Sequence, residues 1–171
     1  VKVLQGDPKN ADALYYVGMV ACAEGQFQQG IALARRSLGF KPGQARAHNL
    51  IGQALHRQGQ LKEALAAFDR ALEGRVDLAD AYSNRARMLR EHEHKNEALS
   101  SFDRAVALKP ESAADWLNRG ATLQTMGRLD DAIASYDRAA ALDPNFPVTH
   151  FNRANALREA GRTEDALAGY D

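Results

Sequence analysis

A residue pattern that returns every 34 residues constrains this chain more than any other feature of its sequence. Between residues 113 and 146, apolar residues at helical spacing run from Trp116 to Leu123 and stop at Gly127. A second apolar series follows this glycine and ends at Pro144. The spacing predicts two amphipathic helices joined by a glycine turn.

The same positions carry equivalent residues along the rest of the chain. An alanine of the second predicted helix recurs, followed four positions later by an aromatic residue: Ala64, Ala98, Ala132 and Ala166, then Phe68, Phe102, Tyr136 and Tyr170. A period of this length, with a helical pair in each repeat, predicts a stacked all-α array in which neighbouring repeats share their apolar faces. We divide residues 1–171, as a single array, into complete repeats 11–44, 45–78, 79–112 and 113–146, with partial repeats 1–10 and 147–171.

These residues resemble the pattern of the tetratricopeptide repeat family. The positions that match it in the reference repeat are Trp116, Gly120, Leu123, Ala132, Tyr136, Ala139 and Pro144. The resemblance covers the whole chain. It implies a right-handed superhelical solenoid of antiparallel helix pairs, in which the first helix of each repeat lines a concave groove. It also implies a scaffold that binds an extended peptide or another protein in that groove, and no enzymatic activity.

The resemblance places candidate partner-binding residues on the inner side of the first helices. They are Asn49, Gln53, Asn84, Arg87, Arg90, Asn118, Gln124, Asn152, Asn155 and Arg158. Asn84, Asn118 and Asn152 form a ladder, and a carboxamide can pair with a peptide backbone because it both donates and accepts hydrogen bonds. The alternative is that asparagine is merely tolerated at a wet surface. The arginines favour acidic partners, although Glu91 and Glu159 weaken this bias.

A second periodicity lies in the charged residues. In three successive repeats an aspartate on the second helix is followed 16 residues later by an arginine on the next first helix: Asp69 and Arg85, Asp103 and Arg119, Asp137 and Arg153. We expect these pairs to form partly buried ion pairs between successive repeats. The alternative is an exposed ladder of charges that contributes little to stability.

Three local departures from the pattern lead to further expectations. The first repeat has Gly30 and Ala34 in the alanine and aromatic places, so we expect it to be the least well specified. Glu93 replaces the turn glycine of its repeat, which predicts a turn that is either strained or differently shaped. The junction from Glu73 to Asp77 contains a glycine and lacks the usual proline, which predicts an irregular bend.

Two other roles compete with a free-standing scaffold. The stretch from Asp80 to Asn84 is similar to repeats of O-GlcNAc transferases and SPINDLY-like proteins, which would make the array a substrate-presenting arm of a larger glycosyltransferase. End-to-end self-association is the second role. It would use apolar residues near both ends, namely Val3, Leu4, Leu167 and Tyr170.

Composition argues against several classes of partner and site. Lys and Arg total 22 and so do Asp and Glu, so no net charge attracts nucleic acid or an anionic membrane. Cys22 is the only cysteine, which fits a reducing compartment such as the cytoplasm. We expect no cofactor and no structural metal, because the turn from His92 to His94 offers too few ligands. His48 and His150 occupy the place of Trp116, where we expect them to pack.

Overall fold

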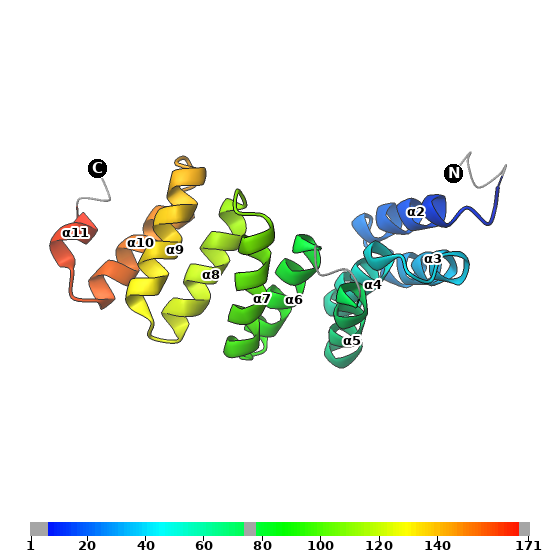
Figure 1. Ribbon diagram of the computed structural model, residues 1–171, viewed down its shortest axis with the longest axis horizontal. Helices are drawn as coiled ribbons and strands as arrows, with labels where there is room; N and C mark the ends of the chain where they lie inside the picture. The colour runs from blue at the N-terminus through cyan, green and yellow to red at the C-terminus, as the bar shows by residue number, and fades with distance from the viewer. Residues whose placement is uncertain (1–6, 74–77, 168–171) are drawn as a thin grey trace. The chain divides into compact units, whose positions relative to one another are not determined.

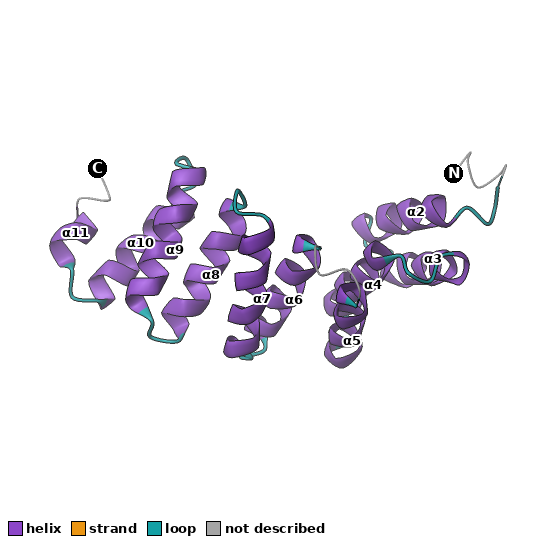
Figure 2. Ribbon diagram, in the orientation of Figure 1, coloured by secondary structure: helices purple, strands orange, loops and turns teal. Residues whose placement is uncertain are grey.

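The computed structural model describes residues 7–73 and 78–167 (Figure 1). Within these ranges all regular secondary structure is α-helical (Figure 2). The chain divides into two compact units, here called the N-terminal unit (residues 1–84) and the C-terminal unit (residues 85–171). The predicted all-α solenoid of stacked helix pairs is confirmed. No helix in the described ranges is long and apolar enough to span a bilayer.

Some expectations fall on residues outside the described ranges. These are the bend at residues 74–77, the apolar residues Val3 and Leu4, and the final residues Tyr170 and Asp171. Self-association through the chain ends therefore stays a prediction, as does the division into a single array of numbered repeats.

The N-terminal unit consists of helices that pack in chain order. They are α2 (Ala11–Ala23), α3 (Phe27–Phe40), α4 (Ala45–Arg57), α5 (Leu61–Leu72) and the start of α6 (Ala79–Glu91). Helix α2 packs on α3, α3 on α4, and α4 on α5, and the two first helices α2 and α4 also touch. Asn10 begins α2 with a side-chain cap, because its Oδ1 accepts a hydrogen bond from the backbone N–H of Ala13 at 2.9 Å.

The C-terminal unit repeats this arrangement. It holds the remainder of α6, then α7 (Lys95–Leu108), α8 (Ala113–Thr125), α9 (Leu129–Leu142), α10 (Pro147–Glu159) and α11 (Thr163–Leu167). Each helix from α7 to α11 packs on the next, and the first helices α8 and α10 touch each other. Ser112 caps α8, and a proline is the first residue of α10, a position where its missing N–H costs nothing.

The turn at Glu93 keeps the backbone conformation of the glycine turns. Glu93 has a φ of 63°, close to the 73° of Gly59 and Gly127. This left-handed conformation is unfavourable for a residue with a Cβ. Of the two predicted outcomes, the strained turn is therefore the one observed.

Small residues on the first helices make room for aromatic rings on the second helices. A Cβ atom added at Gly52 would lie 2.7 Å from the ring of Phe68, and one added at Gly120 would lie 2.6 Å from the ring of Tyr136. Both rings are 0% exposed. The close approach of ring and backbone thus explains why glycine recurs at this place.

The first helix pair, α2 and α3, closes by a different packing. Ala34 stands at the place of the ring and is 0% exposed, while a Cβ at Gly30 would overlap Cys22 Sγ and lie 2.9 Å from Gly18 O. Gly30 is thus required by the cysteine opposite it and by the closeness of the two backbones. The lower stability expected of this repeat stays a prediction.

Two of the three predicted ion pairs are confirmed, both in the C-terminal unit. Arg119 Nε lies 2.7 Å from Asp103 Oδ1, and Arg153 Nε lies 2.5 Å from Asp137 Oδ1. The Arg119 side chain is 22% exposed and the Asp103 side chain 48%, so only the arginine is largely buried. The pairing of Asp69 with Arg85 joins residues of different units and stays a prediction.

The arginines of this series have a second partner that was not predicted from the sequence. Arg119 Nη1 donates to Ser135 Oγ at 2.6 Å, and Arg85 Nη1 donates to Ser101 Oγ at 2.8 Å. Both serines lie 16 residues after their arginine, and Ser135 is only 1% exposed. This contact could have been predicted from the sequence, because the arginine and the serine are absent together. The repeat that has Ile51 at the arginine position has an alanine at the serine position.

Candidate functional site

In the N-terminal unit the predicted inner residues bond to one another. Asn84 Nδ2 donates to Asn49 Oδ1 at 3.2 Å, which ties the start of α6 to α4. Both side chains are half-buried, whereas Gln53 is exposed on α4. Here the ladder asparagines contribute to packing between two first helices.

In the C-terminal unit the predicted arginines differ in their surroundings. Arg90 Nη1 donates to Asn118 Oδ1 at 3.0 Å and to the backbone O of Asn118 at 3.4 Å. Burial lowers the pKa of the Arg90 guanidinium, although it remains charged at neutral pH. Arg158 Nη2 donates to Asn155 Oδ1 at 3.4 Å, and Arg87 is exposed. Arg90 therefore stabilises the ladder, which weakens its predicted role in attracting acidic partners.

A concavity of about 310 Å³ opens between α8, α9 and α10. Its walls combine residues from all three helices: Ala121, Gln124, Thr125, Tyr136, Asn152 and Glu159. It brings together two of the predicted inner residues, Gln124 and Asn152. Tyr136 was predicted only as a packing residue and Glu159 only as a nearby charge, so neither was identified as part of a site.

A chain of hydrogen bonds orders the floor of this concavity. The Tyr136 hydroxyl donates to Gln124 Oε1 at 2.8 Å, and Gln124 Nε2 donates to Glu159 Oε1 at 2.8 Å. Burial raises the pKa of the Tyr136 hydroxyl, so this group stays protonated and acts as a donor. The buried tyrosine thus fixes the orientation of the Gln124 amide, and Gln124 in turn positions the Glu159 carboxylate.

Asn152 is the wall residue whose polar atoms remain unused. Its side chain is half-buried and makes no hydrogen bond to any residue that the structure describes. An amide group that is partly withdrawn from water gains by pairing with a ligand. Of the three ladder asparagines, Asn152 is the one that lines this concavity.

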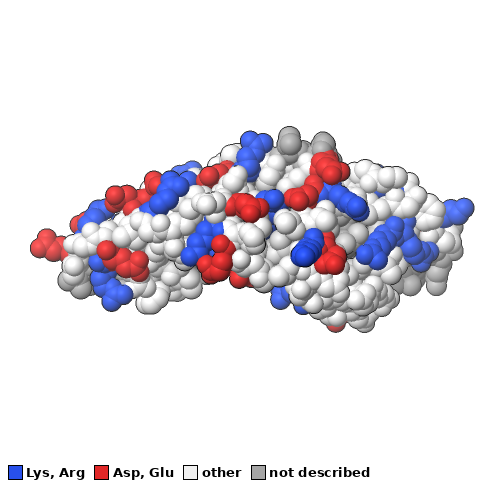
Figure 3. All heavy atoms as spheres, turned by 90° about the horizontal axis from the view of Figure 1, so that it is seen from below, with Lys and Arg blue, Asp and Glu red and all other residues white. Residues whose placement is uncertain are grey.

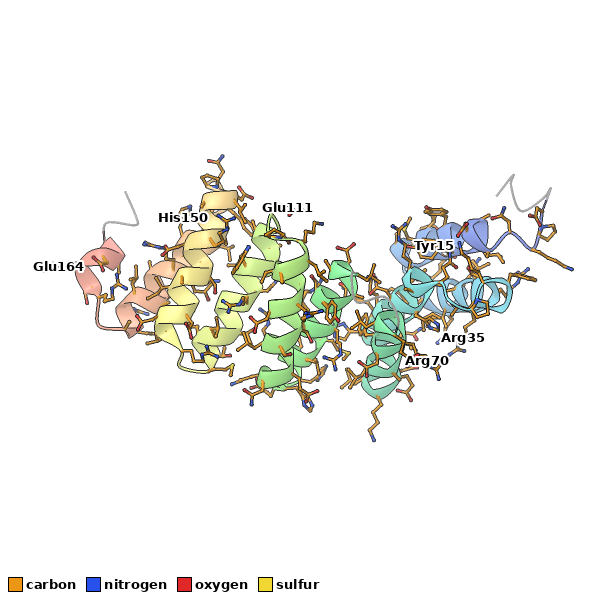
Figure 4. All side chains as sticks on the ribbon, in the orientation of Figure 1. Tyr15, Arg35, Arg70, Glu111, His150 and Glu164 are labelled. Carbon is orange, nitrogen blue, oxygen red and sulfur yellow. The ribbon has the colours of Figure 1, made fainter. Side chains whose placement is uncertain are left out.

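A second, smaller hollow of about 210 Å³ lies in the N-terminal unit. It is lined by Tyr15 and Tyr16 of α2 and by Asp12, Lys41 and Arg46, with Tyr15 labelled in Figure 4. Lys41 Nζ lies 3.3 Å from Asp12 Oδ1, and the two tyrosine rings meet edge to face at 5.1 Å. Burial is the main cause that raises the pKa of Tyr15. None of these lining residues was predicted from the sequence to form a site.

The histidines in the place of Trp116 have a structural role that goes beyond packing. Trp116 Nε1 donates to the backbone O of Pro110 at 2.9 Å, and His150 Nε2 lies 2.8 Å from the backbone O of Pro144 (Figure 4). Each ring therefore ties the start of a first helix to the proline loop before it. In the turn that was considered for metal binding, His94 Nδ1 lies 3.3 Å from Glu97 Oε1.

Comparisons with known proteins place the chain in a repeat family. A family profile described as tetratricopeptide repeat matches residues 9–75, and another described as TPR repeat matches residues 125–161. The chain carries tetratricopeptide repeats. No curated protein matches it in sequence.

Solved tetratricopeptide structures share the fold over most of their length. A crystal structure of MamA is 19% identical with a TM-score of 0.84, covering 95% of this chain and 89% of that chain. YrrB, titled a TPR protein with an unusual peptide-binding site, is 20% identical with a TM-score of 0.81, covering 98% and 87%. PilF of Pseudomonas aeruginosa is 23% identical with a TM-score of 0.85, covering 97% and 76%. The predicted similarity to O-GlcNAc transferase repeats is not among these findings and stays a prediction.

Proposed function

We propose that this tetratricopeptide repeat chain is a protein-interaction scaffold that binds an extended peptide or protein segment on the inner faces of its first helices. The concavity between α8 and α10 is its main contact site. The observation that carries the proposal is Asn152, a half-buried amide with no partner among the described residues, which faces a hollow of about 310 Å³.

The chemistry of the hollow suits a peptide backbone. Asn152 offers one amide oxygen and one amide nitrogen, which match the N–H and C=O of one residue in an extended peptide. Gln124 is held by Tyr136 and Glu159, so little side-chain entropy is lost when a ligand docks beside it. Backbone pairing gives affinity that depends little on the ligand's side chains.

The other predicted inner residues form a secondary surface in this proposal. Arg87 and Arg158 are exposed on first helices of the C-terminal unit and are available for contacts along the remainder of the ligand, and Gln53 is exposed on α4 of the N-terminal unit. The proposal assigns no catalytic step to the chain. The single Cys22 is consistent with binding in a reducing compartment such as the cytoplasm.

Phage display of random 12-residue peptides against the whole chain tests the proposal. Selected peptides are resynthesised, and their Kd is measured on the wild type, on Asn152→Ala and on Asn96→Ala. Asn96 is an exposed asparagine on α7, a second helix, and is the matched control. We expect Asn152→Ala to weaken binding about tenfold, because two amide hydrogen bonds are lost, and Asn96→Ala to leave it unchanged.

Two results contradict this function. Recovery of no peptide above background would reject a peptide-binding scaffold. Peptides that bind the two alanine variants equally well would place binding elsewhere on the chain.

A further inference from the structure

We infer that the concavity between α8 and α10 receives a basic side chain, lysine or arginine, of the bound peptide, with Glu159 as its ionic partner. This inference rests on the proposed function and names the residue type that the site selects. It changes the expected charge preference, since the sequence alone favoured acidic partners.

The charge of the lining supports a basic guest. Of the six lining residues, Glu159 is the one that carries a charge at neutral pH. The Tyr136 hydroxyl is kept neutral because burial raises its pKa, while Asn152 and Thr125 add oxygen atoms that can accept hydrogen bonds from a cation. The hollow therefore presents acceptors around one negative charge.

The nearby arginines have their own partners, but only Arg162 is paired with a carboxylate, whereas Arg90 and Arg158 donate to neutral amides. Arg90 donates to Asn118, Arg158 donates to Asn155, and Arg162 lies 2.7 Å from Asp165. Glu159 forms no ion pair with any residue that the structure describes, and its one hydrogen bond comes from the neutral Gln124 amide. A lysine or arginine side chain of the ligand would thus contact the Glu159 carboxylate, which is oriented by Gln124 but not neutralised by a cation.

The size and surroundings of the hollow also fit a side chain of this type. A volume of about 310 Å³ corresponds to roughly ten water molecules at about 30 Å³ each. On the face drawn in Figure 3, acidic and basic side chains interleave over the C-terminal part at the left. No large field of one sign covers that face (Figure 3).

Titration of the isotope-labelled chain, followed by NMR, tests the inference with defined probes. The probes are Nα-acetyl-lysine N-methylamide, its norleucine counterpart, which has the same stem without the charge, and the glutamate counterpart. We expect the lysine probe to shift the side-chain amide signals of Gln124 and Asn152 at lower concentration than either other probe. The expected preference over norleucine is about two- to fivefold at low salt, as for other exposed ion pairs, and it shrinks as salt is added.

Three variants sharpen the experiment. Glu159→Gln should abolish the preference for the lysine probe, and Glu159→Arg should reverse it towards the glutamate probe. Arg57 stands at the corresponding position of α4, so arginine is compatible with this place in a first helix. Glu164→Gln removes an exposed acidic group on α11 and should leave the preference intact (Figure 4).

The outcomes separate this inference from the function on which it rests. Equal shifts with the lysine and norleucine probes, or an unchanged preference in Glu159→Gln, would overturn the basic guest. If display peptides still bound through Asn152 in that case, the scaffold function would stand. A lysine preference lost in Glu159→Gln, without any recovered peptide, would support a cation site while rejecting the peptide scaffold.

Discussion

The helix triplets α2–α3–α4 and α8–α9–α10 occupy corresponding places in the repeat pattern, yet the two present different polar hollows, and the one that holds Gln124, Asn152 and Glu159 belongs to the second triplet. Each wall residue of the concavity has a counterpart three repeats earlier in the chain, and the two residues always differ. The pairs, with the wall residue first, include Gln124 and Cys22, Tyr136 and Ala34, Asn152 and Leu50, and Glu159 and Arg57. Where α8 and α10 present amides and a carboxylate, α2 and α4 present a thiol, an isobutyl group and a guanidinium.

The difference begins with the presence or absence of one aromatic ring. Tyr136 fills the gap between α8 and α9 and carries its hydroxyl to Gln124. Ala34 cannot fill such a gap, and α2 and α3 approach until a Cβ at Gly30 would touch the opposite backbone. Leu50 is 5% exposed and closes the corresponding surface. One fold thus admits two packings, and the packing around a tyrosine orders Gln124 and Glu159 beside the hollow between α8 and α10.

The largest expected effect comes from removing that ring. Tyr136→Ala should lower the free energy of unfolding by about 3–5 kcal/mol, because a fully buried aromatic ring is replaced by a cavity. The matched change in the other triplet, Ala34→Gly, should cost about 1 kcal/mol, the usual price of glycine in a helix. Urea unfolding followed by circular dichroism measures both values.

Tyr136→Phe separates the ring from the hydroxyl. Phe68 and Phe102 fill the same place in other repeats and are 0% exposed, so the ring itself should fit. We expect a loss of only about 0.5–1.5 kcal/mol from the missing hydrogen bond to Gln124. If Tyr136→Ala cost no more than Ala34→Gly, the two packings would not differ in the way that the structure indicates.

The sequence predicted the fold well because the fold depends on what all repeats share. Helix ends, turn glycines and ring-on-glycine contacts recur with the period, so each repeat supports the prediction made from the others. The ion pairs at Arg119 and Arg153 were predictable for the same reason, since paired charges at a constant separation recur in phase with the helices.

The candidate site was less predictable because it depends on what one repeat does not share. The asparagine ladder looked uniform in sequence, but Asn84 bonds to Asn49, Asn118 bonds to Arg90, and Asn152 faces a hollow. These differences arise from neighbours on other helices, and a residue's own repeat does not reveal them. Glu159 belongs to the candidate site because it accepts a hydrogen bond from Gln124, which lies 35 residues earlier in the chain.

Disturbing the tight packing of α2 and α3 should lower the free energy of unfolding less than Tyr136→Ala does. Gly30→Ala introduces the alanine that other repeats carry, yet its Cβ would overlap Cys22 Sγ and press on Gly18 O. We expect a loss of about 1–3 kcal/mol from overpacking, partly offset by the better helix propensity of alanine. Thermal unfolding of the variant measures the net value.

The double variant Cys22→Ala with Gly30→Ala serves as the control for this contact. Removing Sγ relieves one of the two clashes, so the double variant should be more stable than the sum of the single changes predicts, by about 0.5–3 kcal/mol. Strict additivity would show that the backbone contact with Gly18 alone requires the glycine. A stabilising Gly30→Ala would mean that α2 and α3 separate easily and that their packing is not tight.

The smallest expected effect is the pH dependence of the free energy of unfolding that arises from His48, the counterpart of Trp116 on α4. Burial lowers the pKa of the His48 ring below its ordinary 6.5, with the nearby Arg70 acting in the same direction. The unfolded chain therefore takes up a proton first as the pH falls below about 6.5, and stability is lost from there down to the folded pKa. His48→Trp copies the non-titrating ring of Trp116 and should show a weaker loss of stability between about pH 7.5 and about pH 5.5. Equal pH profiles for the two proteins would show that the folded chain accepts the proton on His48 without cost.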